Sequence, residues 1–159
     1  MTPKFVSILL ICATVLLTTP SKWYTRQYNA SGQLLAEGWL DQDKRTDFWK
    51  WYHNNGRLAS EGHYKNDRKS GYWHFYDLNG NLIKEGHYQN GRAYNWWIFY
   101  DLVRQEKRKV QFQNNQKNGF CLVYKENKLL QVEKFVANKK TGTWTSLRDF
   151  KRDNPETTF

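Results

Sequence analysis

The feature that most constrains this chain is a repeat of 24 residues. The segments "EGHYKNDRKSGYWHFY" (61–76) and "EGHYQNGRAYNWWIFY" (85–100) are nearly the same sequence written twice. The same interval relates several series of residues: Trp49, Trp73 and Trp97; Gly32, Gly56 and Gly80; Leu34, Leu58 and Leu82; and Tyr28, Tyr52, Tyr76, Tyr100 and Tyr124. A short fixed period is the signature of an array built from one structural unit. About five and a half units fill residues 22–150.

Each unit predicts one β-hairpin. In the third unit, "GYWHFY" (71–76) is rich in aromatic residues that favour strands, "DLNG" (77–80) has turn residues, and "NLIKEGHY" (81–88) again predicts a strand. Asn79-Gly80 is the dipeptide preferred in a two-residue type I′ turn. Further turn sequences, such as "QNGR" (89–92), join one unit to the next. The predicted fold class is therefore all-β, an antiparallel meander of repeated hairpins.

A turn tip at Asn79-Gly80 predicts which residues face each other across the hairpin. Trp73 then faces Gly86, and in the preceding unit Trp49 faces Gly62. A large indole can lie flat across a residue that has no side chain. We therefore expect these two rings to rest on these two glycines, and we expect each buried ring to contribute about 2–3 kcal/mol. One hairpin cannot cover its own rings, so several units in series are needed.

The same construction pairs the polar positions of the hairpins. It places His74 opposite Glu85, Lys50 opposite Glu61, Arg26 opposite Glu37 and Tyr76 opposite Ile83. Such cross-strand pairs contribute roughly 0.2–1 kcal/mol each. Glu61 and Glu85 are the carboxylates of an alternative enzymatic hypothesis, a surface hydrolase. They lie one per unit, roughly 10 Å apart by strand spacing, so ladder pairing is favoured and we predict no catalytic residue.

The first 21 residues differ from the rest of the chain. Lys4 precedes a 13-residue apolar run, "FVSILLICATVLL" (5–17). This pattern is typical of a secretory signal peptide and is shorter than the roughly 20 residues of a membrane span. No small-x-small cleavage pair follows, so an uncleaved N-terminal anchor stays open. We expect residues 1–21 to direct the protein to the periplasm or cell envelope, with a cytoplasmic location as the alternative, and residues 151–159 to form a flexible tail.

The formal net charge of +10 predicts an acidic partner or surface. Nine cations fall in the connections between units and should line one edge of the array: Lys44, Arg45, Lys65, Arg68, Lys69, Arg92, Lys117, Lys139 and Lys140. They suit an acidic protein, an anionic membrane surface or a glycan. The alternative is that they only keep the open sheet soluble and unassociated. Nucleic acid is less favoured, because the aromatic residues follow the structural repeat.

The sequence predicts no metal site and no cofactor. His63 and His87 share one repeat position, and the four histidines lack the short spacing of zinc ligands. Cys121 lies in an apolar alternation, which indicates packing. No phosphate-binding or dinucleotide-binding fingerprint is present.

Two segments resemble a known repeat. "FWKWYHNNGRLASEGHYKND" (48–67) and "SGYWHFYDLNGNLIKEGHYQNG" (70–91) are similar to the bacterial variant of the MORN repeat, with its aromatic strand, Asn-Gly turn, Leu, Glu-Gly and Tyr. The pattern weakens in the fourth unit, and in the fifth Glu133 stands where the glycine would be. The resemblance covers roughly residues 23–150. It implies an elongated, single-layer array of hairpins used for binding, with no catalytic residues.

The resemblance also implies a class of function. Family members are linked to membrane association and to protein scaffolding, and a bacterial branch is labelled as antitoxins. We therefore expect a non-enzymatic scaffold that binds another protein at the bacterial cell envelope. An antitoxin or immunity protein that neutralises a cognate toxin is the alternative. Binding of anionic lipid or glycan through the basic edge is the third hypothesis.

Overall fold

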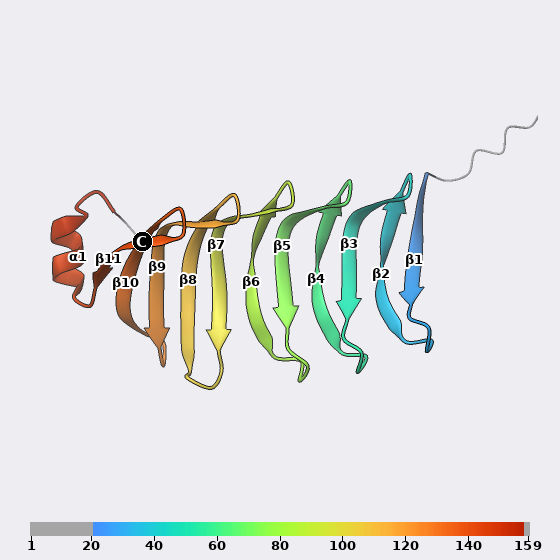
Figure 1. Cartoon of the computed structure of the whole chain (residues 1–159), viewed down its shortest axis with the longest axis horizontal. Coiled ribbons are helices and arrows are strands. Elements are labelled where there is room, and N and C mark those ends of the chain that lie inside the picture. Colours follow the sequence, from blue (N-terminus) through green and yellow to red (C-terminus); the bar gives the residue numbers. More distant parts are fainter. Residues whose placement is uncertain (1–20, 158–159) are drawn as a thin grey trace, which may run out of the picture.

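The computed structural model describes residues 21–157, which form one open antiparallel sheet and a short helix. Each strand is hydrogen-bonded to the next strand in the sequence, so the 11 strands follow one another along the length of the molecule (Figure 1). The strands are β1 (Lys22–Tyr28), β2 (Leu34–Asp41), β3 (Lys44–Tyr52), β4 (Leu58–Lys65), β5 (Arg68–Tyr76), β6 (Leu82–Gln89), β7 (Arg92–Asp101), β8 (Glu106–Gln113), β9 (Gln116–Lys125), β10 (Lys128–Val136) and β11 (Lys139–Trp144). The helix α1 is Leu147–Asp153. This confirms the predicted all-β meander of repeated hairpins in a single layer.

The turns within the units are wider than predicted. Only Gly80 of the Asn79-Gly80 pair adopts a positive φ, of +89°. Its N–H donates to the carbonyl of Asp77 (3.0 Å), and the N–H of Asp77 donates to the carbonyl of Asn81 (2.9 Å). This is a three-residue loop, a type I turn followed by a glycine bulge, so the predicted type I′ turn is wrong here. The Asp77 carboxylate explains the choice, because it accepts the N–H groups of Asn79 and Asn81 and so stabilises the wider loop.

Most of the predicted register is confirmed. Trp73 pairs with Gly86 and His74 with Glu85. The wider loop shifts the pairing by one residue next to the turn, so Tyr76 faces Leu82 and not Ile83.

Type I′ turns occur at the other end of the hairpins, between the units. Both residues have a positive φ in Asn66-Asp67 (50° and 62°), Asn90-Gly91 (51° and 78°) and Asn114-Asn115 (51° and 67°). Each of these turns is bonded to its neighbour. The N–H of Asn115, for example, donates to the carbonyl of Ala93 (3.1 Å), and its side-chain oxygen accepts the N–H of Ala93 (2.6 Å). The turns therefore form one continuous row, at the top of Figure 1.

A bulge bends the strands near this row of turns. In β5, Trp73 pairs with Gly62 of β4, but the next pair joins Ser70 to His63. Two residues of β5, Gly71 and Tyr72, therefore have no partner on β4. One of them, Gly71, has a φ of +66°. Equivalent bulges occur in β3, β7 and β9. Bulges bend a strand and increase its twist, and Figure 1 shows the strands curving as they approach the turns.

The core is a row of indoles on one face of the sheet, which we call the indole face. Trp49 and Trp73 have no exposed surface, and Trp97 is 3% exposed. Tyrosine rings stand edge-on between them: Tyr64 lies 5.1 Å from Trp73, and Tyr88 lies 5.0 Å from Trp97, between ring centroids. The indole and tyrosine rings thus bury one another without a second layer.

The seat of each indole differs from the prediction. A Cβ added to Gly62 would lie 2.4 Å from the ring of Trp73, and a Cβ added to Gly86 would lie 2.3 Å from the ring of Trp97. Each indole therefore crosses the glycine of the preceding strand. The predicted seats, Gly62 for Trp49 and Gly86 for Trp73, are wrong, although the pairing of these residues is correct.

The hydrogen bond of the indole explains this choice. Trp73 has a glycine opposite it on both sides, Gly62 on β4 and Gly86 on β6. The bulge interrupts the ladder on the β4 side, and the indole N–H donates to the carbonyl of His63 there (3.1 Å). A buried N–H needs an acceptor. The ring therefore turns towards β4.

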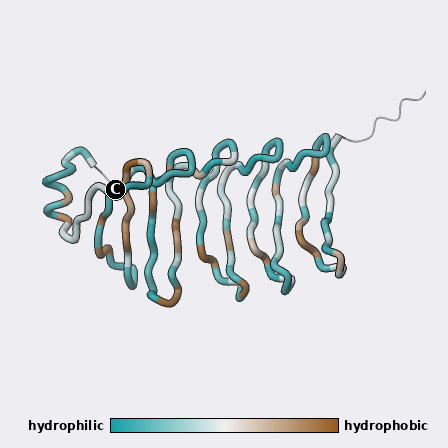
Figure 2. Tube along the Cα trace, viewed as in Figure 1, coloured by the Kyte–Doolittle hydropathy of each residue, from teal (hydrophilic) through white to brown (hydrophobic). Residues whose placement is uncertain are grey.

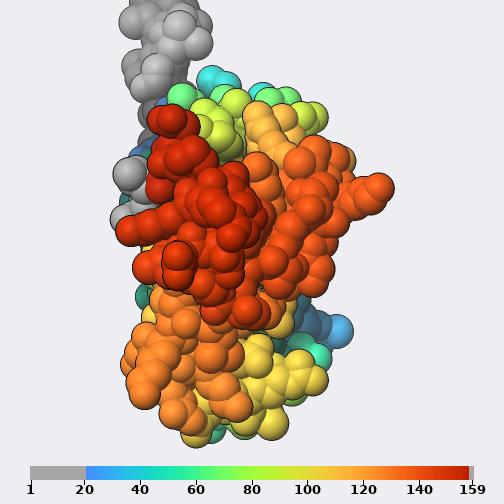
Figure 3. Space-filling model, turned by 90° about the vertical axis from the view of Figure 1, so that its left-hand side faces the viewer, coloured from blue at the N-terminus to red at the C-terminus, as the bar shows by residue number. Residues whose placement is uncertain are grey.

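The helix α1 closes the C-terminal end of the sheet (Figure 3). Phe150 is 1% exposed, and its ring lies 5.4 Å from those of Phe120 and Trp144, edge to face. Ser146 caps the helix by accepting the N–H of Asp149. The expected boundaries at residues 150 and 151 fall inside this helix. The expected leader, apart from Ser21, lies outside the described residues.

Candidate functional site

The nine predicted cations lie next to the row of turns between units, but they do not form one free border. Five are exposed and make no ion pair among residues 21–157: Lys44, Lys65, Arg68, Arg92 and Lys139. Lys44, Lys65 and Arg68 line a shallow hollow together with Asp67. Asp41 and Asp43 share this end of the row. Figure 2 shows most of the row as hydrophilic, with a hydrophobic stretch at the turn between β10 and β11. The charge of the row is mixed at its N-terminal end.

Three of the nine cations cover aromatic rings and are therefore structural. They share one position of the 24-residue repeat, which Ala93 occupies in the unit between Lys69 and Lys117. Arg45 lies over Tyr64 (4.6 Å to the centroid), Lys69 over Trp73 (4.3 Å) and Lys117 over Phe135 (5.1 Å). Burial lowers the pKa of Lys69, and the charges of Lys84 and Arg45 act in the same direction. Arg45 also donates to Asp67 (2.8 Å). These side chains shield the rings from solvent.

Lys140 pairs with a buried carboxylate. Its ammonium lies 2.9 Å from Glu133, a residue that is 4% exposed and occupies the repeat position of the glycine. Gln131 donates to the same carboxylate (3.1 Å). A buried carboxylate needs such partners, so Lys140 has a structural role.

The repeat glutamates define the opposite side of the sheet, which we call the carboxylate face. Each accepts a hydrogen bond from a tyrosine 15 residues later: Tyr52 to Glu37 (2.6 Å), Tyr76 to Glu61 (3.0 Å) and Tyr100 to Glu85 (2.6 Å). The bond from Tyr52 lowers the pKa of Glu37, and burial with the bond to Glu61 raises the pKa of Tyr76 to about 12. The sequence reasoning missed this contact, although both series follow the 24-residue interval.

The predicted cross-strand partners are present in register but bond unevenly. Arg26 lies 3.2 Å from Glu37, and His74 lies 3.5 Å from Glu85. Lys50 faces Glu61, but no ion pair joins them in the part of the chain that the structure describes. Every repeat glutamate is thus held by a phenol. These bonds from Tyr76 and Tyr100 give Glu61 and Glu85 a structural explanation.

A second row of rings crosses the carboxylate face, and we call it the aromatic row. Its members are spaced by 24 residues: Tyr24, Phe48, Tyr72, Trp96 and Phe120. The first three contact a ring on the neighbouring strand, which is Trp39 for Tyr24 (5.4 Å), His63 for Phe48 (5.1 Å) and His87 for Tyr72 (4.7 Å). Tyr24 is 45% exposed and Phe48 is 38% exposed. The sequence reasoning missed this row, although its interval was already known.

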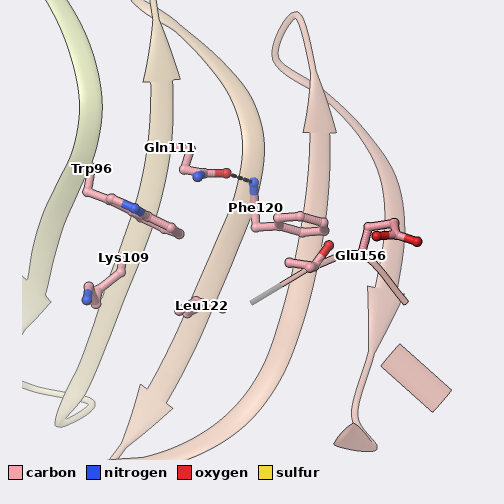
Figure 4. Close-up of a pocket in the computed structure, with 7 residues that line it drawn as sticks. Trp96, Lys109, Gln111, Phe120, Leu122 and Glu156 are labelled. Atoms are coloured by element: carbon pink, nitrogen blue, oxygen red, sulfur yellow. Dashed lines mark hydrogen bonds between the residues drawn. The ribbon is translucent and has the colours of Figure 1, made fainter. Parts of the chain in front are cut away.

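A hollow of about 450 Å³ lies at the C-terminal part of the aromatic row. Figure 4 shows Trp96 of β7 and Phe120 of β9 on its two sides, with Lys109 on β8 between these strands and Leu122 on β9 beside Phe120. The Lys109 ammonium lies 5.6 Å from the Trp96 centroid, and Gln111 accepts the N–H of Phe120 (2.7 Å). Such a site can hold an apolar or aromatic side chain, with a cation at its rim.

Cys121 and the metal-ligating side chains are the remaining candidates for chemistry that the sequence analysis considered. Burial raises the pKa of the Cys121 thiol to about 11, so the thiol is inert at neutral pH. Within residues 21–157, no three His, Cys, Asp or Glu side chains converge as metal ligands. The one helix in this range is too short to cross a membrane.

The fold and its surfaces define an open β-hairpin repeat protein. Two of its segments, residues 49–66 and 69–90, match the family described as MORN repeat variant. These matches support the resemblance that the sequence indicated. MORN repeats are generally modules for protein or membrane binding and are typically non-enzymatic. No curated protein matches the chain.

Proposed function

We propose that this protein is a non-catalytic scaffold of the bacterial cell envelope that binds another protein through the aromatic row. The observation that supports this is the exposure of Tyr24 and Phe48 on an open face of the sheet. Aromatic side chains are enriched among the residues that dominate binding energy. Their spacing along the sheet gives a partner several contact points in one line.

The helix α1 illustrates how the row engages a side chain. Phe150 packs edge to face on Phe120, the last member of the row, and is almost completely buried there. A partner segment with a similar ring can contact the earlier members, Tyr24 and Phe48, in the same way. Each well-packed aromatic contact of this type contributes about 0.5–1.5 kcal/mol beyond its buried area.

The exposed cations fit an acidic partner. Arg92 and Lys139 flank two of the three later turns of the row, which hold no acid. Lys44, Lys65 and Arg68 border one hollow, which they share with Asp67. Rim charges of this kind act mainly on the rate of association and on its salt dependence. We therefore expect them to steer the partner, while the aromatic row provides most of the affinity.

The test is a cross-linking pull-down from the envelope fraction with matched surface variants. The double variant Tyr24→Ser/Phe48→Ser removes two rings of the row. The control, Leu102→Ser/Val103→Ser, removes two exposed apolar side chains of a turn (53% and 95% exposed). We expect wild type and control to recover the same protein and the row variant to lose it. Equal recovery by both variants, or no partner in any sample, would reject the proposal.

The envelope location is inferred from residues 1–21, which lie outside the described residues except for Ser21. N-terminal sequencing of the mature protein tests it. A new N-terminus near residue 22 indicates export, and an intact leader in a cytosolic fraction contradicts it.

An antitoxin would use the same exposed surface, because masking one toxin requires a contiguous patch of anchor residues. Co-expression with an adjacent toxic reading frame distinguishes this alternative. Rescue of growth that Tyr24→Ser/Phe48→Ser abolishes would favour the antitoxin. Growth arrest without rescue would reject it.

A further inference from the structure

The two ends of the sheet differ. At one end, β11 lies beside α1, and the indole of Trp144 donates to Asp153 of that helix (2.9 Å). At the other end, β1 has one neighbour within residues 21–157, which is β2. Its side chains are largely exposed, with Tyr24 at 45% and Tyr28 at 55%. An open strand edge offers unpaired backbone groups to another strand.

We infer that β1 pairs with β1 of a second copy of this chain, antiparallel and centred on Thr25. The sequence of β1, "KWYTRQY", is self-complementary in this arrangement. Tyr24 faces Arg26 of the second copy, and Lys22 faces Tyr28 of the second copy. Both pairs occur twice because of the two-fold symmetry. Cross-strand pairs of a cation with an aromatic ring are attractive.

Other registers are worse. Opposed residues of an antiparallel pair lie on the same face of the sheet. The nearest alternative registers therefore shift one strand by two residues along the other, in either direction. One such slip places Lys22 opposite Arg26 of the second copy. The other places Arg26 opposite its own equivalent. Like charges directly opposite each other are destabilising, so the register centred on Thr25 is preferred, and it is the one that pairs all seven residues.

The cations are already partly neutralised within each copy. Lys22 forms an ion pair with Asp47, and Arg26 pairs with Glu37 (3.2 Å). Bringing two β1 strands together therefore does not collect four uncompensated charges. On the indole face, the β1 side chains that lie opposite the second copy are Trp23, Thr25 and Gln27. All three are uncharged.

Head-to-tail association, in which β11 of one copy lies beside β1 of the next, is disfavoured because of the direction of these strands. The sheet has 11 antiparallel strands, so β1 and β11 run the same way. Placing β11 of one copy beside β1 of another would make a parallel pair, which is slightly less stable per residue. A two-fold axis beside β1 gives an antiparallel pair and a closed dimer.

Disulfide cross-linking tests the register. In the proposed dimer, the two copies of residue 25 lie about 5 Å apart between Cα atoms, while the two copies of residue 27 lie about 14 Å apart. We expect the full chain with Thr25→Cys to form a covalent dimer on mild oxidation. Gln27→Cys, on the same face, and wild type should stay uncross-linked. Equal cross-linking of the two variants, or none in either, would overturn the register.

Analytical ultracentrifugation tests the dimer itself. Tyr28→Lys places a lysine opposite Lys22 of the second copy, twice per dimer. Tyr94→Lys makes the same change at another exposed tyrosine (46%) far from β1. We expect Tyr28→Lys to weaken the dimer about tenfold or more and Tyr94→Lys to leave it unchanged. A wild-type monomer at all concentrations, or equal weakening by both variants, would overturn the inference.

Discussion

Replacing Gly86 with alanine should destabilise the sheet through one indole, that of Trp97. The added Cβ would lie 2.3 Å from Cδ2 and 2.5 Å from Cγ of this ring, whereas carbon atoms in contact lie about 3.5–4.0 Å apart. Gly86 has no positive φ, so its backbone accepts an alanine. The clash with the ring is therefore the source of the cost.

The ring of Trp97 has little room to move. Tyr88 stands edge-on at 5.0 Å, and Phe112 lies 6.1 Å away, between ring centroids. Overpacking of this kind costs about 1–3 kcal/mol. If the indole is displaced, it also loses its bond to the carbonyl of His87 (3.0 Å), which adds about 1 kcal/mol. We expect Gly86→Ala to lower the free energy of unfolding by about 3 kcal/mol.

Urea unfolding in a double-mutant cycle measures this effect and its origin. In a Trp97→Leu background, Gly86→Ala should cost less than about 1 kcal/mol, because the clash is gone. In a Trp73→Leu background, it should keep its full cost. Lys139→Ala, at an exposed site, is the reference for a neutral change. Coupling of Gly86 to Trp73 in place of Trp97, or a cost equal to that of Lys139→Ala, would refute the reasoning.

Three further predictions concern single side chains. The indole N–H of Trp51 is buried without a hydrogen bond among the described residues. Trp51→Phe should therefore change the free energy of unfolding, measured by chemical denaturation, by less than about 1 kcal/mol. A larger loss of stability would contradict this. The pKa of Glu37 is lowered mainly by Tyr52, so the carboxylate contributes stability above its unfolded pKa, and this contribution is lost as the pH falls through the folded pKa. Tyr52→Phe should therefore be less stable than wild type by about 1.5 kcal/mol near pH 7, with the gap shrinking below about pH 4.5 in pH-dependent urea titrations; a gap that is independent of pH would contradict the role of Glu37. Phe150→Ala should cost about 3–5 kcal/mol and expose the end of the sheet near Phe120, as followed by hydrogen exchange of β9–β11; unchanged exchange would show that α1 is not the cap.

The repeat interval was sufficient to predict the strands and most of their register. Equivalent strands carry aromatic residues at the same positions of the unit. The hairpin centre at Asn79-Gly80 gives the correct pairs from Gly71 to Phe75. The turn type was not predictable from this dipeptide alone. The side chain of Asp77 stabilises the wider loop by accepting two N–H groups, and this contact depends on the folded turn.

The sequence left open which glycine each indole covers, the one on the following strand or the one on the preceding strand. Pairing within a hairpin leaves Trp97 opposite Val110 and leaves Gly38 without a ring. Pairing with the preceding strand gives all three indoles a glycine. The sequence therefore contained the signal, but the bulge that provides the acceptor for the indole N–H could not be seen in it.

The candidate site was predicted in part. Position next to a turn did not separate the exposed Lys65 from Lys69, because the direction of the side chain across the sheet decides which one covers a ring. The 24-residue interval would have separated them, since Arg45, Lys69 and Lys117 share one position. It would also have revealed the aromatic row from Tyr24 to Phe120.

The most direct test of the account is to measure, by proton NMR, the α-proton chemical shifts of Gly38, Gly62 and Gly86. If the indoles lie flat on Gly38, Gly62 and Gly86, the ring currents should shift the α protons of these residues strongly upfield. The spectra should also show nuclear Overhauser contacts from Gly62 to the ring of Trp73 and from Gly86 to the ring of Trp97. Ordinary α-proton shifts at these glycines, or contacts from Gly86 to the ring of Trp73 alone, would contradict the account.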